Sequence, residues 1–284
     1  MSSRTAPSGR GGLALRILPR PMLATRGGAF GGRGSAHLVE RHARVYRHAW
    51  VMLLSGVAEP LFFLLSIGIG IGSLVGRVAG PAGHPVSFTS FVAPALLATS
   101  AMNGAVMDST FNVFFRLKYA KLYDSALATP MRSGDIALGE VAWALIRGGL
   151  YALSFLAVMA VMGLIHTPWA AAALPAALLI GFGFAGAGMA ATTFMSSWQH
   201  FEFVTLATLP MFLFSTTFYP LSVYPRPLQI AVECTPLFQG VTLIRALTLG
   251  PVTPALLWPV LYLGIMGLAG LALASRRISG LLLK

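Results

Sequence analysis

Four ionisable side chains stand inside long apolar stretches of this sequence, where a charge needs a chemical reason. They are Glu59, Asp108, Glu140 and Arg147. A charge at the centre of a bilayer costs at least about 2.5–3.5 kcal/mol on insertion scales, so an unpaired one is strongly disfavoured. Such groups either join helices as ion pairs or take part in moving charge through the protein.

The depth of these groups predicts which of them pair. Counted from the ends of their apolar stretches at 1.5 Å per residue, Glu59, Arg147 and Asp108 lie about 13, 16 and 12 Å deep. We therefore predict a Glu59–Arg147 ion pair, with Asp108 nearby as a candidate for protonation. Glu140 is expected nearer the surface. The sequence leaves open whether this intramembrane polar cluster rearranges between functional states or is a fixed contact that holds the helices together.

Other site chemistries find little support. The six histidines show no His-x3-His pair and no carboxylate-rich company, so no metal site is expected. Cys234 is the single cysteine, which excludes an intrachain disulfide. No Walker A motif occurs, so ATP binding through a P-loop is excluded, and "GIGIG" lies mid-stretch without a strand before it. No cofactor is expected in this chain.

The elements that must position these groups are membrane helices. The chain has 284 residues, 56% of them hydrophobic and 10% charged, with a mean hydropathy of +0.76. Six apolar runs cover residues 50–75, 88–115, 136–165, 169–195, 204–223 and 254–274. Each reaches the ~20 residues that span a bilayer, and in lipid such runs form helices. We predict an all-α membrane protein with six transmembrane helices.

Small residues predict close helix packing in two of these runs. Gly68 and Gly72 have the small-x3-small spacing, and "GFGFAGAGMAA" in the fourth run has the same character. Glycines of this kind let helix backbones approach each other in a membrane.

The basic residues predict the orientation. Of 20 lysines and arginines, 16 fall before the first run, between runs two and three, or after run six. Only Arg77, Arg226 and Arg245 fall on the other side, so both termini are expected in the cytoplasm. Residues 1–36 read as a disordered basic cytoplasmic tail, 37–280 as the transmembrane domain and 281–284 as a cytoplasmic C-terminus.

An amphipathic stretch, "HLVERHARVYRHAW", precedes the first run. Its apolar residues can share one side, with arginines around them: Leu38, Val39, Val45, Tyr46 and Trp50. This pattern is typical of a helix that lies in the membrane interface. The alternative is a solvated helical lead-in to the first span.

The most polar cytoplasmic loop is "FRLKYAKLYDSALATPMRSGDIALGE". Run two is expected to end at Phe115–Arg116, followed by a short helix over residues 117–127 that Thr129–Pro130 breaks. A soluble partner could grip this helix through Lys118, Tyr119, Lys121, Leu122, Tyr123 and Asp124. The alternative is a loop whose charge only sets topology.

Five stretches of the sequence resemble a known family in their order. They are "EPLFFLLSIGIGIG", "FVAPALLATSAMNGAVMDSTFNVFFRLKYAKLYDSALATP", "DIALGEVAWALIRGGLYA", "FLFSTTFYPLSVYPRPLQ" and "TPLFQGVTLIRALTLG". The resemblance covers residues 38–280 and is to permease subunits of ABC-2 type exporters, in the nodulation-factor and antibiotic exporter subgroup. One departure is Phe238-Gln239, where many relatives have Thr or Ser followed by His.

The resemblance implies partners and a mechanism. Two permeases, identical or homologous, would face each other and bind two copies of a separate ATPase subunit, which holds ATP and Mg²⁺. The 117–127 segment would be the coupling helix on that ATPase. Between spans five and six the family has short re-entrant helices, and the prolines of residues 219–250 agree, since they forbid one long helix.

The fifth run indicates only the chemical class of the substrate. Its aromatic residues form a candidate path for a hydrophobic or amphiphilic molecule such as a drug, polyketide, lipid or glycolipid: Phe201, Phe203, Met211, Phe212, Phe214 and Phe218. Ordinary packing is the alternative for any one of them. The expected setting is the cell membrane, with several passes and no nucleic acid.

Two other function classes fit the sequence less well. An ion-coupled secondary transporter predicts inverted repeats, which the span pattern lacks. A membrane-embedded lipid-modifying enzyme needs reactive groups gathered at one interface, whereas the eight acidic residues here are scattered. The chain itself is therefore not expected to be an enzyme.

Overall fold

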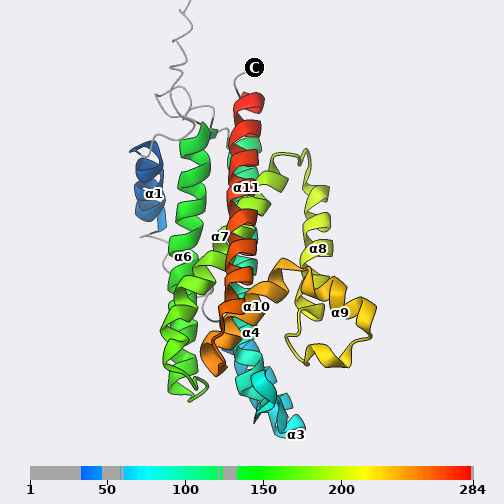
Figure 1. The fold of residues 1–284 in the computed structure, drawn as a ribbon. Coiled ribbons are helices and arrows are strands. Elements are labelled where there is room, and N and C mark those ends of the chain that lie inside the picture. The colour runs from blue at the N-terminus through cyan, green and yellow to red at the C-terminus, as the bar shows by residue number, and fades with distance from the viewer. Residues whose placement is uncertain (1–32, 47–57, 59–60, 121, 124–132, 283–284) are drawn as a thin grey trace, which may run out of the picture.

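The computed structural model describes residues 33–46, 58, 61–120, 122–123 and 133–282, and it shows a bundle of long helices (Figure 1). Of the predicted tail, residues 1–36, the first 32 residues lie outside this range, and residues 33–36 form the start of a helix. The long helices are α4 (Phe88–Met107), α6 (Ser133–Val161), α7 (Ala173–Thr192) and α11 (Leu257–Leu282). Two π-helical turns, η3 (Asp108–Asn112) and η4 (Phe115–Tyr119), continue α4, so that one helix runs from Phe88 to Tyr119.

Shorter elements surround these helices. In chain order they are α1 (Arg33–Tyr46), η1 (Ser66–Ile71), α3 (Gly72–Val75), β1 (Arg77–Ala79), η2 (Pro81–Gly83), β2 (Pro85–Ser87), η5 (Pro168–Ala172), η6 (Trp198–His200), α8 (Phe201–Phe214), η7 (Leu221–Val223), α9 (Arg226–Glu233), α10 (Pro236–Leu249) and η8 (Pro254–Leu256). Strands β1 and β2 form a small antiparallel hairpin in which Val78 lies opposite Val86.

The predicted helical membrane protein is confirmed, but the count of six spans is not. Four described helices are long and apolar enough to cross a membrane: Phe88–Tyr119, Ser133–Val161, Pro168–Thr192 and Pro254–Leu281. The pair α9–α10, bent by 84°, passes the same test as a broken span or a re-entrant loop. Much of the first predicted run, including residues 50–57 and 59–60, lies outside the described residues.

The fifth predicted run is not one continuous helix, and this prediction was wrong. Helix α8 ends at Phe214, and Thr216 takes a positive φ of 60°. Local hydroxyl groups explain the stop: Thr217 Oγ1 donates to the carbonyl of Phe212 at 3.1 Å, which offers the backbone an alternative to the helix. At 14 residues α8 is shorter than the ~20 that a full span requires.

The predicted end of the second run was also wrong. The helix does not stop at Phe115–Arg116 but continues to Tyr119 through η4. Residues 122 and 123 are helical again, whereas residues 121 and 124–132 lie outside the described part, so the predicted 117–127 helix is only partly visible. Its first residues belong to the long helix instead.

Glycines bring α7 and α11 into backbone contact, as the sequence predicted. A Cβ added to Gly186 would meet the carbonyl oxygen of Gly267 at 2.4 Å, and one on Gly270 would meet Gly186 at 2.3 Å. The first run follows the same rule, because a Cβ on Gly68 would meet Thr89 Cγ2 at 2.7 Å. Any larger residue at these contacts would force the helices apart.

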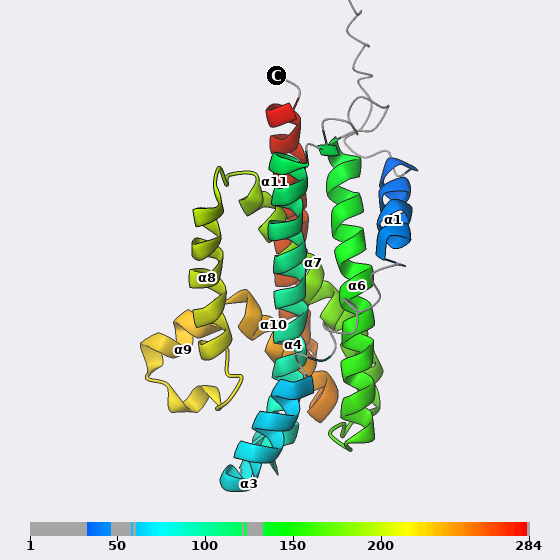
Figure 2. The same cartoon turned by 180° about the vertical axis from the view of Figure 1, so that it is seen from behind.

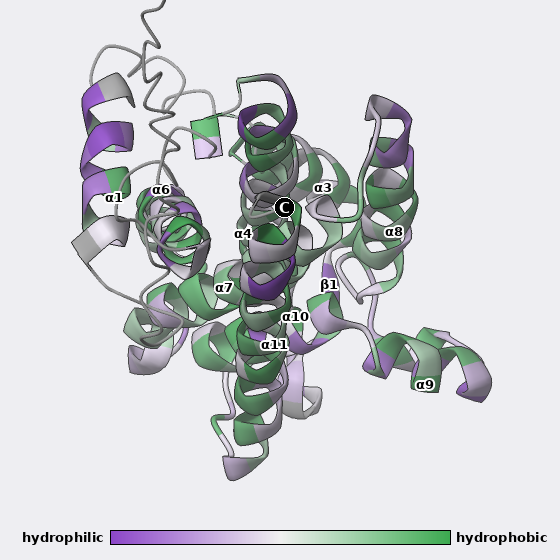
Figure 3. Cartoon of the chain, turned by 90° about the horizontal axis from the view of Figure 1, so that it is seen from above, coloured by the Kyte–Doolittle hydropathy of each residue, from purple (hydrophilic) through white to green (hydrophobic). Residues whose placement is uncertain are grey.

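Helix α1 packs beside the Ser133 end of α6 (Figures 1 and 2). Seen from above, α6 is nearly end-on while α1 is seen from its side, so the two helices cross (Figure 3). Ser35, Leu38 and His42 form its buried face, and Gly139 of α6 leaves room for Leu38. The arginines Arg41 and Arg44 lie on the exposed side.

Candidate functional site

Glu140 is the centre of a buried polar cluster at the α1 end of the bundle. Its side chain is 4% exposed and accepts hydrogen bonds from Arg116 and from Tyr123 Oη, the latter at 2.9 Å. His42 Nε2 lies 3.8 Å from Glu140 Oε1. The cluster therefore joins α1, the end of the long α4 helix and α6, and we call it the Glu140 cluster.

Burial sets the protonation of its members outside the spanning helices. It lowers the pKa of His42 from 6.5 to about 4, with further lowering by the positive charges of Arg116 and Arg41. Burial also raises the pKa of Tyr123, and the Glu140 carboxylate adds to that rise. His42 is therefore neutral at pH 7, and Tyr123 keeps the proton that it donates to Glu140.

A second ion pair lies deeper in the bundle. Arg147 of α6 donates a hydrogen bond to Asp108 Oδ1, which also accepts one from Asn112 Nδ2 at 2.8 Å. The Arg147 guanidinium is 6.0 Å from the centre of the Tyr151 ring. We call this the Asp108–Arg147 pair.

These contacts revise the predicted polar cluster. Arg147 pairs with Asp108, which was expected only as a neighbour; Glu59, its predicted partner, lies outside the described residues. Glu140 belongs to a separate site, one full heptad before Arg147 and so about 10 Å along α6. Asp108 is thus a direct partner of Arg147, and the predicted contact between Glu59 and Arg147 stays a prediction.

The Asp108–Arg147 pair sits on a break in regular helix geometry. Residues Asp108–Asn112 form a π-helical turn, a feature often found at functional sites. The carbonyl of Ser109 in this turn accepts a hydrogen bond from Thr192 Oγ1 of α7 at 3.0 Å. A Cβ on Gly188 would meet Ser109 Oγ at 2.2 Å, so the backbone of α7 packs directly against this turn.

The residues predicted to contact a soluble partner differ in their exposure. Tyr119 is 55% exposed, and Lys118 is exposed beside it. Tyr123, predicted as an exposed anchor, is 1% exposed and bonded to Glu140, so the structure gives it an internal role. Leu122 is half-buried, while Lys121 and Asp124 lie outside the described residues.

The aromatic residues predicted as a substrate path do not form one lining within the described chain. Phe201 is 6% exposed and packs with Phe114 and Met195. Met211, Phe212 and Phe218 are partly buried against the main core. Phe203 and Phe214 point outward instead, at 66% and 40% exposure.

Helix α8 is the least covered of the longer described helices. Phe201 is its only buried residue. Large apolar side chains are exposed along it: Phe203, Leu206, Leu209, Leu213 and Phe214. In Figures 1 and 2 it stands beside the bundle, away from α6.

Sequence reasoning missed the role of Arg245, which it used only as an orientation signal. Arg245 in α10 is 8% exposed and donates from Nη2 to the carbonyl oxygens of Thr216 at 2.8 Å and Phe91 at 3.2 Å. Its guanidinium lies 3.9 Å from the centre of the Phe91 ring. The signal in the sequence was an arginine inside the otherwise apolar helix "GVTLIRALTL".

Within the residues described, no three His, Cys, Asp or Glu side chains gather in a way that could hold a metal ion. The free cysteine, Cys234, is exposed just after α9.

Comparison with known proteins places this arrangement in a family. The model of the "ABC-2 type transporter" family matches residues 36–249. A protein called Nodulation protein J from Rhizobium leguminosarum bv. trifolii is 37% identical over 205 residues, which are 71% of this chain and 76% of that protein. Proteins of the same name from Sinorhizobium fredii and R. leguminosarum bv. viciae are 35% and 34% identical, over 68% and 71% of this chain and 72% and 76% of their own length.

Proposed function

Because this chain belongs to the ABC-2 type transporter family and is a membrane subunit of an ABC transporter, we propose that it is the permease of an ATP-driven exporter. The cargo would be a hydrophobic or amphiphilic molecule that leaves the cytoplasm or the inner leaflet. The observation that carries the proposal is the family match over residues 36–249, which covers the helices around both ion pairs.

An associated ATPase follows from membership of the family, and we propose two copies of it per complex, with ATP and Mg²⁺ bound there. The expected docking end is the one where the Tyr119 end of the α4 helix, the Ser133 end of α6 and the C-terminal end of α11 meet (Figures 1 and 2). Ser133 Oγ and Ser279 Oγ lie 2.5 Å apart there. Exposed Lys118 and Tyr119 at this end supply a charge and an aromatic anchor.

A second permease, identical or homologous, would cover the exposed apolar face of α8. This face is open to such contact within the described chain, since Phe201 is the only buried residue of α8 and five large apolar side chains are exposed along it. Two such faces brought together would enclose a path between the subunits. Phe203 and Phe214 would then line it.

The membrane is proposed to be the cell membrane, with both termini in the cytoplasm. Arg116, Lys118, Arg276 and Arg277 lie at the proposed ATPase end. Arg77 and Arg226 lie on elements towards the other end. This distribution agrees with the rule that cytoplasmic loops carry the excess of positive charge.

The coupling role is tested by Tyr119→Ala. Truncating an exposed aromatic anchor is expected to weaken ATPase association by at least about tenfold, in line with ~1.4 kcal/mol or more per interface anchor. The measurement is the amount of ATPase that co-purifies with the permease, together with substrate-stimulated ATP hydrolysis. The matched control is Trp169→Ala, an equally exposed aromatic in η5 beyond the far end of α6. Equal loss in both variants, or in neither, would contradict the docking assignment.

A further inference from the structure

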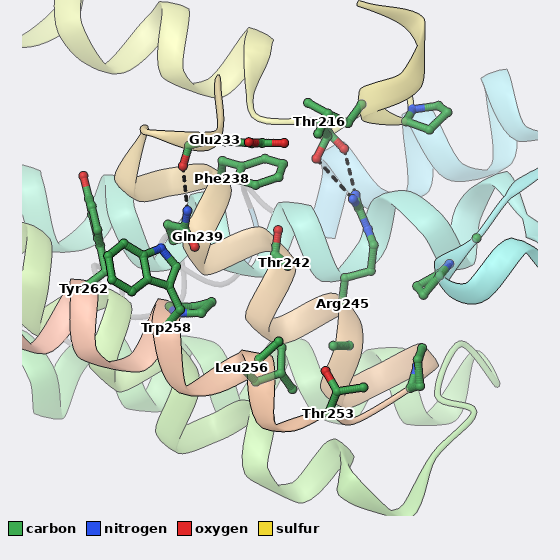
Figure 4. A pocket seen from close by; sticks show the side chains of 18 of the residues that line it. Thr216, Glu233, Phe238, Gln239, Thr242, Arg245, Thr253, Leu256, Trp258 and Tyr262 are labelled. Carbon is green, nitrogen blue, oxygen red and sulfur yellow. Dashed lines mark hydrogen bonds between the residues drawn. The ribbon is translucent and has the colours of Figure 1, made fainter. Parts of the chain in front are cut away.

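A large cavity lies between α9, α10 and the start of α11, away from both ion pairs (Figure 4). Its volume is about 890 Å³, within the range of sites that hold a drug-sized ligand. The hairpin loop around Gly80 and Pro81 contributes to its wall, as do Thr216 and Leu221 from the segment after α8. Two parts of the chain that are distant in sequence, residues 79–91 and 216–262, thus meet around one space.

The cavity has a charged end and an apolar end. Arg245 and Thr216 lie at one end in Figure 4, while Trp258 and Tyr262 lie at the other. Phe238 and Leu256 add apolar surface between them. This lining suits a molecule with a polar head and a hydrocarbon body.

The charge at Arg245 makes no ion pair with an acidic side chain among the described residues. Its Nη atoms are bonded to two carbonyl oxygens and, from Nη1, to Thr216 Oγ1 at 3.3 Å, and its Nε has no hydrogen-bond partner. No Asp or Glu oxygen in the described part of the chain lies within 4 Å of it. Arginine stays protonated in proteins, so within the described residues this buried positive charge is compensated by dipoles and the Phe91 ring.

We propose that the cavity between α9, α10 and α11 binds an amphiphile with an anionic head, whose head lies against Arg245 and whose hydrocarbon chain lies along Phe238, Leu256 and Trp258. The head, a phosphate, sulfate or carboxylate, supplies the missing counter-charge, and the chain covers apolar wall. The binding site does not depend on the proposed export activity, because it is built by one chain and needs no ATPase.

Glu233 determines which end of the cavity the anionic head occupies. It also lines the cavity, but its side chain is exposed and makes no ion pair with Arg245. An anion is repelled by Glu233 and attracted by Arg245, so the head lies at the Arg245 end. Glu233→Gln removes a like charge and is expected to tighten anion binding. Weaker binding in Glu233→Gln would mean a cationic head and would overturn the proposed ligand class.

The central experiment measures binding of dodecyl phosphate to the full chain in nanodiscs of phosphatidylcholine. Arg245→Gln keeps a hydrogen-bond donor but removes the charge, and it is expected to weaken binding at least tenfold. The matched control is Arg226→Gln on α9, an exposed arginine outside the cavity that is bonded to Gln229. Arg226→Gln is expected to bind like the parent. No binding to the parent chain, or equal binding to parent and Arg245→Gln, would overturn the proposal.

A second variant keeps the test decisive if Arg245→Gln does not fold. Thr242→Phe narrows the cavity while leaving Arg245 in place, and it is expected to abolish dodecyl phosphate binding without changing the thermal unfolding midpoint. Dodecanol and inorganic phosphate are expected to bind at least tenfold more weakly than dodecyl phosphate, because each lacks one half of the recognised structure. Equal binding of dodecanol would exclude a role for the charge and overturn the proposal.

The source of the amphiphile is distinguished by native mass spectrometry of the chain purified from its membrane. A bound anionic phospholipid that is lost in Arg245→Gln and retained in Arg226→Gln identifies membrane lipid as the ligand. A bound mass that is not a phospholipid, with the same dependence on Arg245, identifies a cellular amphiphile instead. A bound mass that is retained in Arg245→Gln contradicts the proposal.

Discussion

At the scale of single residues, the molecule separates two buried ion pairs that differ in their surroundings. The Asp108–Arg147 pair is enclosed by a π-helical turn, whereas the Glu140 cluster lies where α1 meets α6. Removing one member of a buried pair leaves an uncompensated charge, which costs about 3–5 kcal/mol, while replacing both by apolar groups is often neutral. The two sites can therefore be tested independently.

Arg147→Leu is expected to reduce the yield of folded protein severely, because it strands Asp108. The double change Asp108→Leu with Arg147→Leu is expected to recover much of that loss. The measurement is the fraction of monodisperse protein after extraction, together with its thermal unfolding midpoint. Arg77→Leu, on the exposed hairpin, is the control and is expected to behave like the parent. A double variant as poor as the sum of the two singles would refute the pair.

His42 makes the contact between α1 and α6 sensitive to pH. Its pKa is about 4 when docked and 6.5 when exposed, so the undocked helix takes up a proton first as the pH falls. Docking is therefore unaffected by His42 well above pH 6.5 and weakens between pH 6.5 and about 4, by roughly 3–4 kcal/mol at most. The groups around His42 are Glu140, Arg116 and Arg41, and the two arginines oppose its protonation.

Hydrogen exchange of the α1 amides measures this effect. Protection is expected to fall between pH 6.5 and 4 in the parent, after correction for intrinsic exchange rates. His42→Gln is expected to remove that dependence, whereas His37→Gln, at an exposed site of the same helix, is expected to keep it. Protection that rises with falling pH would show that protonated His42 pairs with Glu140 instead.

At the scale of elements, close backbone contact between α7 and α11 sets the architecture of the bundle. Gly270→Ala is expected to destabilise the protein, since the new Cβ would lie 2.3 Å from the Gly186 backbone. Gly264→Ala on the same helix meets nothing within 4 Å and is expected to be neutral or to stabilise by up to about 1 kcal/mol. The measurement is the thermal unfolding midpoint of both variants; equal midpoints would refute the contact.

Much of this arrangement could be predicted from sequence, because apolar length and glycine spacing are local signals. The four long helices and the contact of "GFGFAGAGMAA" with a neighbour follow from such signals. The end of α8 could not be predicted from hydropathy, because Ser215 and Thr217 are tolerated in a span until their hydroxyls bond to the backbone carbonyl of Phe212. The direct contact between Arg147 and Asp108 depends on how the helices are rotated about their axes, which depth alone does not fix.

At the scale of the whole molecule, Cys234 reports the orientation in the membrane. It is the only thiol, it is exposed, and it follows α9, away from the Tyr119 end of the bundle. An impermeant thiol reagent is therefore expected to label it from outside the cell and not from the cytoplasm. Label uptake is read by mass spectrometry in intact cells and in inverted vesicles, with Cys234→Ser as the blank. Labelling only in inverted vesicles would reverse the proposed topology.

The shortness of α8 has a consequence for the lipid around the protein. Fourteen helical residues cover only about 21 Å, whereas the hydrocarbon core of a bilayer is about 30 Å thick. The exposed face of Phe203, Leu206 and Leu213 thus matches a thinner membrane than α6 or α11 does. Where lipid contacts α8, this hydrophobic mismatch is expected to thin the bilayer along that side of the chain, at a cost of fractions of a kcal/mol per Å. Lipids with longer acyl chains make a thicker bilayer and raise this free-energy cost. They therefore favour a protein surface, rather than lipid, against the exposed face of α8.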